Sequence, residues 1–344
     1  MVLQSICRLA PSPTGSQHLG NARTFLLAYW SARSQNAKLI LRIEDIDSPR
    51  VKPWATAQAI EDLAWLGMEH DGEPIIQTER VALYQRVLDR MIADNQVYPC
   101  TCSRTDIENA ASAPHDDPST GVRASTPSQP GIQSIAAETT IYPGTCSNWQ
   151  HGDPLPAADE FCWRFRISPH RMTFHDKVAG TLACDPATVI GDFPVTRKGG
   201  DAAYQLAVVV DDIDAGVTEV VRGDDLLVSA FRQMQIYDYL GATHPNYAHV
   251  PLVVGRDGRR LAKRHGDTRL SQYREQGIAG EAIVASAARS AIGDRDVLPG
   301  GSETMTWDLT RWHREMTRRF DWRHVSRDQV IYDEAFEGYD DGSS

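Results

Sequence analysis

The segment at residues 8–23, RLAPSPTGSQHLGNAR, constrains the fold more than any other part of the chain. An apolar strand leads into a turn that contains prolines and glycines, and a helix begins near Gly20. A helix N-terminus presents unpaired N–H groups and a positive dipole end to an anion, and His18 can donate to phosphate oxygens. A Pro- and Gly-containing turn alone is also common on protein surfaces. With the helix directly after it, the segment predicts a phosphate-binding turn.

Strand and helix patterns alternate along the rest of the chain and predict an α/β fold. Apolar positions at helical spacing predict helices at residues 21–35, 54–66 and 226–240, the last ended by Gly241. LILRIEDID predicts a strand that runs into a turn, and FCWRFRIS predicts a second strand. AAYQLAVVVDDIDAGVTEVV, residues 202–221, predicts two buried strands of a parallel sheet separated by an acidic turn. Helical segments follow Asp267.

Composition and charge narrow the class of protein. The chain has 344 residues, of which 41% are apolar, enough for a substantial core. The formal charge of −11 argues against non-specific binding to nucleic acid, because that affinity comes from Lys and Arg, although a local basic surface is not excluded. The start has no signal-peptide pattern, and no apolar stretch is long enough to span a membrane. We expect a cytoplasmic monomer without membrane association.

A cationic segment, GRRLAKRHGD at residues 258–267, follows the apolar segment HVPLVVGRDG. A basic loop alone is ordinarily a solvated surface. Together with the first motif, however, it resembles the class I aminoacyl-tRNA synthetases of the glutamyl and glutaminyl type. PSPTG followed by His18 and Gly20 resembles the HIGH motif, with Asn21 in the place of the second histidine. RLAKR resembles the KMSKS loop, with Arg260 for the first lysine and alanine for the serine.

This resemblance implies that ATP is a substrate, with Mg²⁺ on its phosphates. His18 and Lys263 would be catalytic, because both match residues that contact the phosphates as pyrophosphate leaves. The residues implied for ATP binding are Pro11, Gly15, His18, Gly20, Asn21, Arg260 and Lys263.

The resemblance also implies a pocket for L-glutamate. Arg8 and Arg222 would hold its carboxylates, in an order that the sequence leaves open. Glu44 would bind the amino group and Tyr204 would close the pocket. Because a buried arginine that binds a carboxylate rejects an amide, glutamate is favoured over glutamine. The implied pocket residues are Arg8, Ala10, Ser12, Glu44, Tyr204 and Arg222.

Cysteine spacing suggests a structural zinc site. Cys100 and Cys102 lie in YPCTCSR, and IYPGTC brings Tyr142 and Cys146. Three thiolates and a phenol oxygen can complete a tetrahedral shell, although Cys-x-Cys is less diagnostic than Cys-x-x-Cys. The pattern resembles the zinc site of glutamyl-queuosine tRNA(Asp) synthetases. The other cysteines, Cys7, Cys162 and Cys184, are expected to be buried thiols, with Cys184 as the nearest rival ligand.

The expected fold is a Rossmann-like nucleotide-binding catalytic domain with an inserted zinc-bearing α+β subdomain. Residues 111–136, rich in Ser, Pro, Asp and Gly, are expected to form a flexible segment within the insertion. The expected units are the first half of the catalytic domain at 1–97, the inserted acceptor-binding-like subdomain at 98–190, the second half at 191–270, and a helical segment and tail at 271–344.

The resemblance covers residues 8–267 and leaves little chain for an anticodon-binding region. It therefore implies tRNA-independent activation of glutamate and transfer to the queuosine base at the wobble position of tRNA(Asp). Two alternatives remain open at this point. One is a shortened synthetase that charges a tRNA acceptor end, and the other is an inactive zinc-stabilised RNA-binding paralogue.

Overall fold

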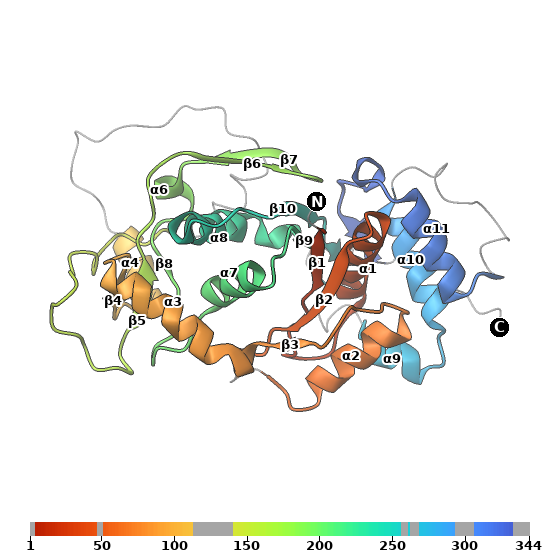
Figure 1. Ribbon diagram of the computed structural model, residues 1–344, viewed down its shortest axis with the longest axis horizontal. Coiled ribbons are helices and arrows are strands. Elements are labelled where there is room, and N and C mark those ends of the chain that lie inside the picture. The colour runs from red at the N-terminus through yellow and green to blue at the C-terminus, as the bar shows by residue number, and fades with distance from the viewer. Residues whose placement is uncertain are drawn as a thin grey trace.

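The structure is a computed structural model that describes residues 4–46, 51–112, 140–255, 261, 268–292 and 306–332. Figure 1 shows a central sheet with helices on both faces and a smaller sheet at one end of the molecule. Across these ranges, no helix combines the length and the apolar character needed to cross a bilayer.

The central sheet has seven strands in the order β3-β2-β1-β9-β10-β6-β7. Neighbours pair in parallel, except that β7 is antiparallel to β6. The strand order changes direction between β1 and β9, and open α/β sheets bind ligands beyond the carboxyl ends of the strands at such a point. The strands are β1 (Ile6–Leu9), β2 (Lys38–Ile43), β3 (Ile75–Ile76), β9 (Glu219–Gly223), β10 (Asn246–Val250), β6 (Met172–Asp176) and β7 (Gly180–Cys184).

Successive side chains of these strands point to opposite faces of the sheet and pack in different hydrophobic cores. In β2, Leu39 and Leu41 pack with α1, whereas Ile40 between them packs with α8. This period of two requires helices on both faces of the sheet. On one face α1 (Leu19–Ser34) packs against α10 (Gly280–Ala291) and α11 (Leu309–Arg319). On the other lies α8 (Leu227–Leu240), followed outward by α7 (Tyr204–Asp214) and α3 (Val81–Ala93).

A three-stranded antiparallel sheet forms the core of the inserted region. Its strands are β4 (Val97–Cys100), β5 (Cys162–Phe165) and β8 (Phe193–Pro194). The β4 and β5 strands pair so that Cys100 lies opposite Cys162. The remaining elements are α2 (Ala55–Trp65), α4 (Arg104–Ser112), α6 (Pro186–Val189), α9 (Leu270–Glu275), the strand pair β11 (Val253–Val254) and β12 (Val330–Ile331), and short 3₁₀ helices at Gln77–Arg80, Asp224–Leu226 and Trp322–His324.

Most of the predicted elements are present, and the α/β fold class is confirmed. The helices expected at 21–35, 54–66 and 226–240 are α1, α2 and α8. Gly241 ends α8 with a φ of 69°, a left-handed conformation that glycine adopts without strain. Residues 111–112 are the last of α4, and the rest of the segment expected to be flexible lies outside the described residues.

The prediction of two strands at residues 202–221 was wrong in its first half. Residues 204–214 form α7, and only the second apolar run is a strand, β9. The run from Leu206 to Val210 is buried throughout, and a short run that is apolar on every side does not distinguish a buried helix from a buried strand. The helix carries Asp211 and Asp212 into the interior, where arginines compensate their charge.

Candidate active site and metal centre

His18 is the N-cap of α1, and the helix that it begins holds its ring in place. Its Nδ1 accepts from the backbone N–H of Gly20 at 3.1 Å and of Asn21 at 3.4 Å. The Asn21 side chain in turn accepts from the His18 N–H at 3.1 Å, which completes a capping box. Since Nδ1 accepts, the proton of the neutral ring lies on Nε2, the nitrogen that can donate to a ligand. Asparagine at position 21 therefore has a structural role in the cap.

A pocket of about 660 Å³ opens beyond the carboxyl ends of β1, β2 and β9 and beside the start of α1. It brings together ten of the predicted site residues: Arg8, Ala10, Ser12, Gly15, His18, Gly20, Asn21, Glu44, Tyr204 and Arg222. Pro11 does not line it but lies next to it, because its carbonyl accepts from the Glu44 N–H at 3.0 Å. One pocket thus contains the predicted phosphate-binding turn and the predicted amino-acid site.

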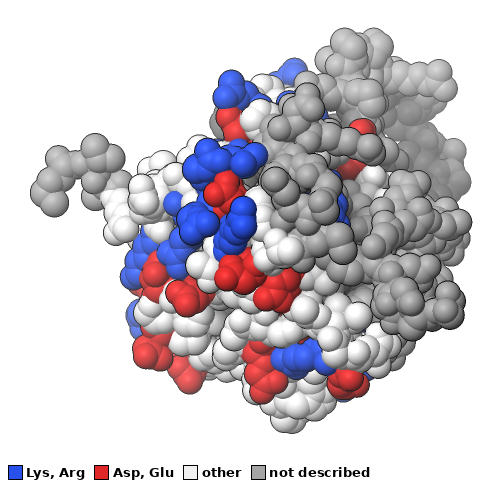
Figure 2. All heavy atoms as spheres, turned by 90° about the vertical axis from the view of Figure 1, so that its right-hand side faces the viewer, with Lys and Arg blue, Asp and Glu red and all other residues white. Residues whose placement is uncertain are grey.

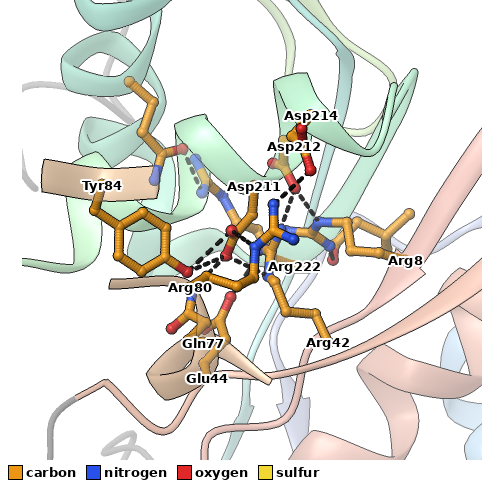
Figure 3. A network of polar contacts seen from close by, with 12 residues as sticks. Arg8, Arg42, Glu44, Gln77, Arg80, Tyr84, Asp211, Asp212, Asp214 and Arg222 are labelled. Carbon is orange, nitrogen blue, oxygen red and sulfur yellow. Dashed lines mark hydrogen bonds and ion pairs between the residues drawn. The ribbon is translucent and has the colours of Figure 1, made fainter. Parts of the chain in front are cut away.

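A buried charge network supports Glu44 at the wall of this pocket (Figure 3). Arg42 donates to Glu44 Oε1 at 2.9 Å and forms an ion pair with Asp212. The Nε of Arg8 lies 3.8 Å from the same Asp212 carboxylate. Burial alone would lower the pKa of Arg42, but Asp212, Glu44 and Asp211 outweigh it and raise that pKa. The network fixes one oxygen of Glu44 and compensates its charge.

Sequence reasoning missed Arg42, Asp211 and Asp212. Asp211 accepts from the Tyr84 hydroxyl at 2.9 Å and pairs with Arg80 at 2.7 Å, so it joins α7 to α3 and the segment before it. The available signal was a charged residue inside an apolar strand, as in LILRI. Fully buried charges are rare unless they are paired.

Arg222 is held by a second chain of buried groups that the sequence did not indicate. Its Nε donates to His249 Nε2 at 2.9 Å, and its Nη1 donates to Gln233 at 2.7 Å. His249 Nδ1 lies 2.7 Å from Asp176 Oδ2. Burial above all lowers the pKa of His249 to about 4, so its ring is neutral and accepts from Arg222 while donating to Asp176. Burial would raise the pKa of Asp176, but hydrogen bonds, first from His249, lower it.

Arg260 and Lys263 lie outside the described residues, but the chain on both sides of them reaches the pocket. Val253 lines the pocket before this segment. After it, the carbonyl of Thr268 accepts from the Leu19 N–H at 3.1 Å, and the Leu270 N–H donates to Gln17 at 2.9 Å. The described residues before and after the predicted basic loop therefore lie at the pocket and beside the N-terminus of α1.

The predicted zinc ligands converge in the inserted region. The sulfur atoms of Cys100, Cys102 and Cys146 all lie within 4.8 Å of one another, and Cys102 and Cys146 are 3.6 Å apart. Two thiolates on one tetrahedral zinc are about 3.8 Å apart, from a Zn–S bond of about 2.3 Å. The Tyr142 hydroxyl lies 3.4 Å from Cys100 Sγ and 3.7 Å from Cys102 Sγ. The donor set and its spacing fit a tetrahedral zinc ion.

Cys162, expected to be a buried thiol, is only partly buried, and it also corrects the expected rival ligand. Cys184, the expected rival ligand, lies on β7 and packs in a different core. Cys162 instead lies opposite Cys100 in the small sheet, and its thiol donates to the Cys100 carbonyl at 3.6 Å. A hydrogen bond from Cys162, above all, lowers the pKa of Cys100 to about 4, which favours the thiolate that binds metal. The nearest further thiol is therefore Cys162.

Comparison with known proteins agrees with this arrangement. The profile of the class I tRNA synthetases (E and Q), catalytic domain, matches residues 5–327. The match extends past residue 267, where the sequence resemblance was expected to stop, and includes α10 and α11. A glutamate tRNA ligase structure from Elizabethkingia meningosepticum has the same fold, with a TM-score of 0.73, 23% identity and coverage of 96% of this chain and 67% of that one.

The names of sequence relatives narrow the family further. A glutamyl-Q tRNA(Asp) synthetase of Rhodopirellula baltica is 56% identical, over 97% of this chain and 98% of the relative. One of Symbiobacterium thermophilum is 40% identical, over 90% and 94%. A glutamate–tRNA ligase of Acidiphilium cryptum is 36% identical over 90% of this chain but only 63% of its own length. The chain belongs to the class I tRNA synthetases of the E and Q type and, within them, to the family of ligases named glutamyl-Q tRNA(Asp) synthetases.

Proposed function

We propose that this enzyme activates L-glutamate with ATP in the absence of tRNA and transfers the glutamyl group to the queuosine base at the wobble position of tRNA(Asp). The observation that carries the proposal is one pocket in which two buried arginines, Arg8 and Arg222, lie with Glu44 beside the N-terminus of α1. The names of the relatives that match nearly the whole chain support queuosine-bearing tRNA(Asp) as the acceptor.

In this proposal the substrate is recognised by its charges. Arg8 and Arg222 each bind one carboxylate of glutamate, and Glu44 binds its ammonium group. Both arginines are at most 5% exposed, so a carboxylate that pairs with them does so away from water, where such a pair is stronger. Tyr204, at the first turn of α7, closes the pocket. An amide would leave a buried guanidinium without a matching anion, which selects against glutamine.

Activation places the ATP phosphates at the turn before α1. The glutamate α-carboxylate attacks the α-phosphorus, and glutamyl-adenylate forms as pyrophosphate leaves. His18 donates from Nε2 to the phosphate oxygens, and the backbone N–H groups of the helix N-terminus face the same anion. Arg260 and Lys263 add cations as the leaving group forms. When bound, Mg²⁺ supplies further charge neutralisation on the phosphates.

Transfer needs no nucleophile from the protein. A hydroxyl of the queuosine cyclopentenediol attacks the activated carbonyl of glutamyl-adenylate, its proton is released, and AMP leaves. Cys100, Cys102, Tyr142 and Cys146 of the inserted region would hold a structural zinc ion, which would stabilise the fold around the small sheet. The proposal includes the division expected from the sequence, with catalytic halves at 1–97 and 191–270 and an insertion at 98–190.

Two assays test the proposal. Glutamate-dependent exchange of labelled pyrophosphate into ATP, measured without RNA, reports activation, with glutamine as the control amino acid. Transfer of labelled glutamate is then measured with tRNA(Asp) that carries queuosine, tRNA(Asp) that lacks it, and tRNA(Glu). The proposal requires exchange with glutamate and transfer to the first RNA only. Charging of tRNA(Glu) regardless of queuosine would identify an acceptor-end synthetase, and absence of exchange would identify an inactive paralogue.

A further inference from the structure

Helix α11 exposes a row of arginines on the side opposite its apolar face. Trp312, His313 and Met316 are buried against α1 and α10. The outward side chains are those of Arg311, Arg314, Arg318 and Arg319, which we call the α11 arginine face. Figure 2 views the molecule from the side on which α10 and α11 lie in Figure 1 and shows Lys and Arg side chains gathered there.

Within the described part of α11, one carboxylate, that of Glu315, lies among three of the four arginines of this face. Glu315 alone lies 3.9 Å from Arg314, 2.9 Å from Arg318 and 3.3 Å from Arg319. Arg314 and Arg318 are 65% and 62% exposed, so they can reach a partner without unfolding the helix. Arg311 lies over the ring of Trp307 at 4.7 Å, which steadies the first guanidinium of the row. Three guanidiniums around one carboxylate are a local exception in a chain of net charge −11.

The cations of this face are all guanidinium groups, in a chain in which arginine far outnumbers lysine throughout. A guanidinium donates two parallel hydrogen bonds to a phosphate, whereas a lysine acts as a point charge. Arginines spaced by one helical turn present such forks at intervals of about 5 Å along the helix.

The arginine face is also connected to the rim of the candidate active site. After α11 the chain reaches β12, which pairs with β11 so that Val330 lies opposite Val253. Val253 lines the pocket. The chain that continues from α11 therefore reaches a strand pair at the pocket.

We propose that the α11 arginine face binds the phosphate backbone of the RNA substrate. The inference rests on the proposed function, because it assigns part of the tRNA contact surface of the same enzyme. It concerns affinity and position rather than base recognition, because contacts to phosphate carry no sequence information. Glutamate activation, which needs no RNA, is independent of this surface.

The test compares two double variants with matched local structure. Arg314→Gln/Arg318→Gln removes two cations from the arginine face. Arg86→Gln/Arg90→Gln removes two exposed cations from α3, where Arg90 is 58% exposed and pairs with Asp94, the C-cap of that helix, much as Arg318 pairs with Glu315. Binding of fluorescently labelled tRNA(Asp) transcript is measured at several salt concentrations, together with pyrophosphate exchange and transfer to queuosine-bearing tRNA(Asp).

The α11 variant should bind RNA roughly tenfold more weakly, and its log–log salt slope should become shallower by about 1 for each arginine removed. Exchange should stay at the wild-type level, and the KM for tRNA should rise with little change in kcat. Wild-type affinity and slope in the α11 variant, equal losses in the α3 variant, or no binding of RNA by the wild type would overturn the inference. Failure of the wild type to transfer glutamate to queuosine, with the binding difference intact, would instead overturn the acceptor in the proposed function.

Discussion

Arg222 donates from Nε to Nε2 of His249 across 2.9 Å, in a place where both side chains are at most 5% exposed. The contact uses one donor of the guanidinium inside the protein, and Gln233 uses a second. Its Nη2 donates to the Leu226 carbonyl at 3.3 Å, and Arg222 also forms part of the pocket wall. A histidine is suited to this position only when its ring is neutral, because an imidazolium has no lone pair to accept the bond.

The first prediction concerns this support for Arg222. His249→Ala should raise the KM for glutamate in pyrophosphate exchange roughly tenfold, because Arg222 loses the acceptor that orients it. The KM for ATP should change much less. His249→Gln keeps an oxygen that can accept from Arg222 and should recover most of the affinity for glutamate. Equal losses in kcat and in both KM values, without recovery by glutamine, would mean that His249 serves only packing.

The second prediction is a pH dependence of stability. The pKa of His249 is lowered from 6.5 to about 4 by burial, so between these values the unfolded chain holds a proton that the folded chain lacks. Stability contributed by the neutral ring is therefore present above pH 6.5 and is lost as the pH falls toward 4. From pH 7 to pH 5 the loss should be on the order of 1–2 kcal/mol.

Chemical denaturation at both pH values measures this loss. Burial also lowers the pKa of His313, so the wild type alone does not isolate His249. His249→Gln removes the titrating ring and should show a smaller loss of stability between pH 7 and pH 5 than the wild type. The same pH dependence in both proteins would contradict the assignment.

The sequence predicted those features that depend on neighbouring residues. Gly241 marked the end of α8, and the strand–turn–helix at residues 8–23 placed His18 near a helix start, where it caps α1. The residues predicted for the pocket came from segments that resemble a known family, and the structure places ten of them along one pocket. The α7 helix was missed because its apolar run has no polar face.

The supporting network was not predictable because its members are distant in the sequence. Arg42 and Asp212 are separated by 170 positions, and His249 and Asp176 by 73. Asp176 belongs to β6, within the inserted region, and β6 joins the central sheet only through β10. No local sequence pattern indicates that β6 pairs with β10. The same applies to Cys162, which reaches Cys100 through strand pairing rather than through a ligand motif.

The third prediction concerns the metal centre. Cys146→Ser should reduce bound zinc, measured by elemental analysis of the purified protein, because it removes one of three clustered thiols. Treatment with a strong chelator should lower the melting temperature of the wild type by several degrees, since metal binding contributes to folding. Cys184→Ser is the matched control, because that thiol packs in another core. Zinc content equal in the two variants would exclude Cys146 as a ligand.

The fourth prediction separates the two roles of His18, as the N-cap of α1 and as a hydrogen-bond donor to phosphate. His18→Asn keeps an N-cap acceptor for the start of α1 but removes the Nε2 donor. Its stability should match that of the wild type, while the kcat of pyrophosphate exchange should fall about a hundredfold, as it does when one donor to a developing oxyanion is removed.

His18→Ala loses both roles, so its exchange should fall similarly and its free energy of unfolding should also drop by about 1 kcal/mol. Asn21→Ala is the complementary control, because it opens the capping box but leaves the imidazole in place, and it should cost stability more than rate. If His18→Asn retained wild-type exchange, His18 would be a helix cap only, and phosphate stabilisation would have to come from the helix N-terminus and the basic loop between residues 258 and 267.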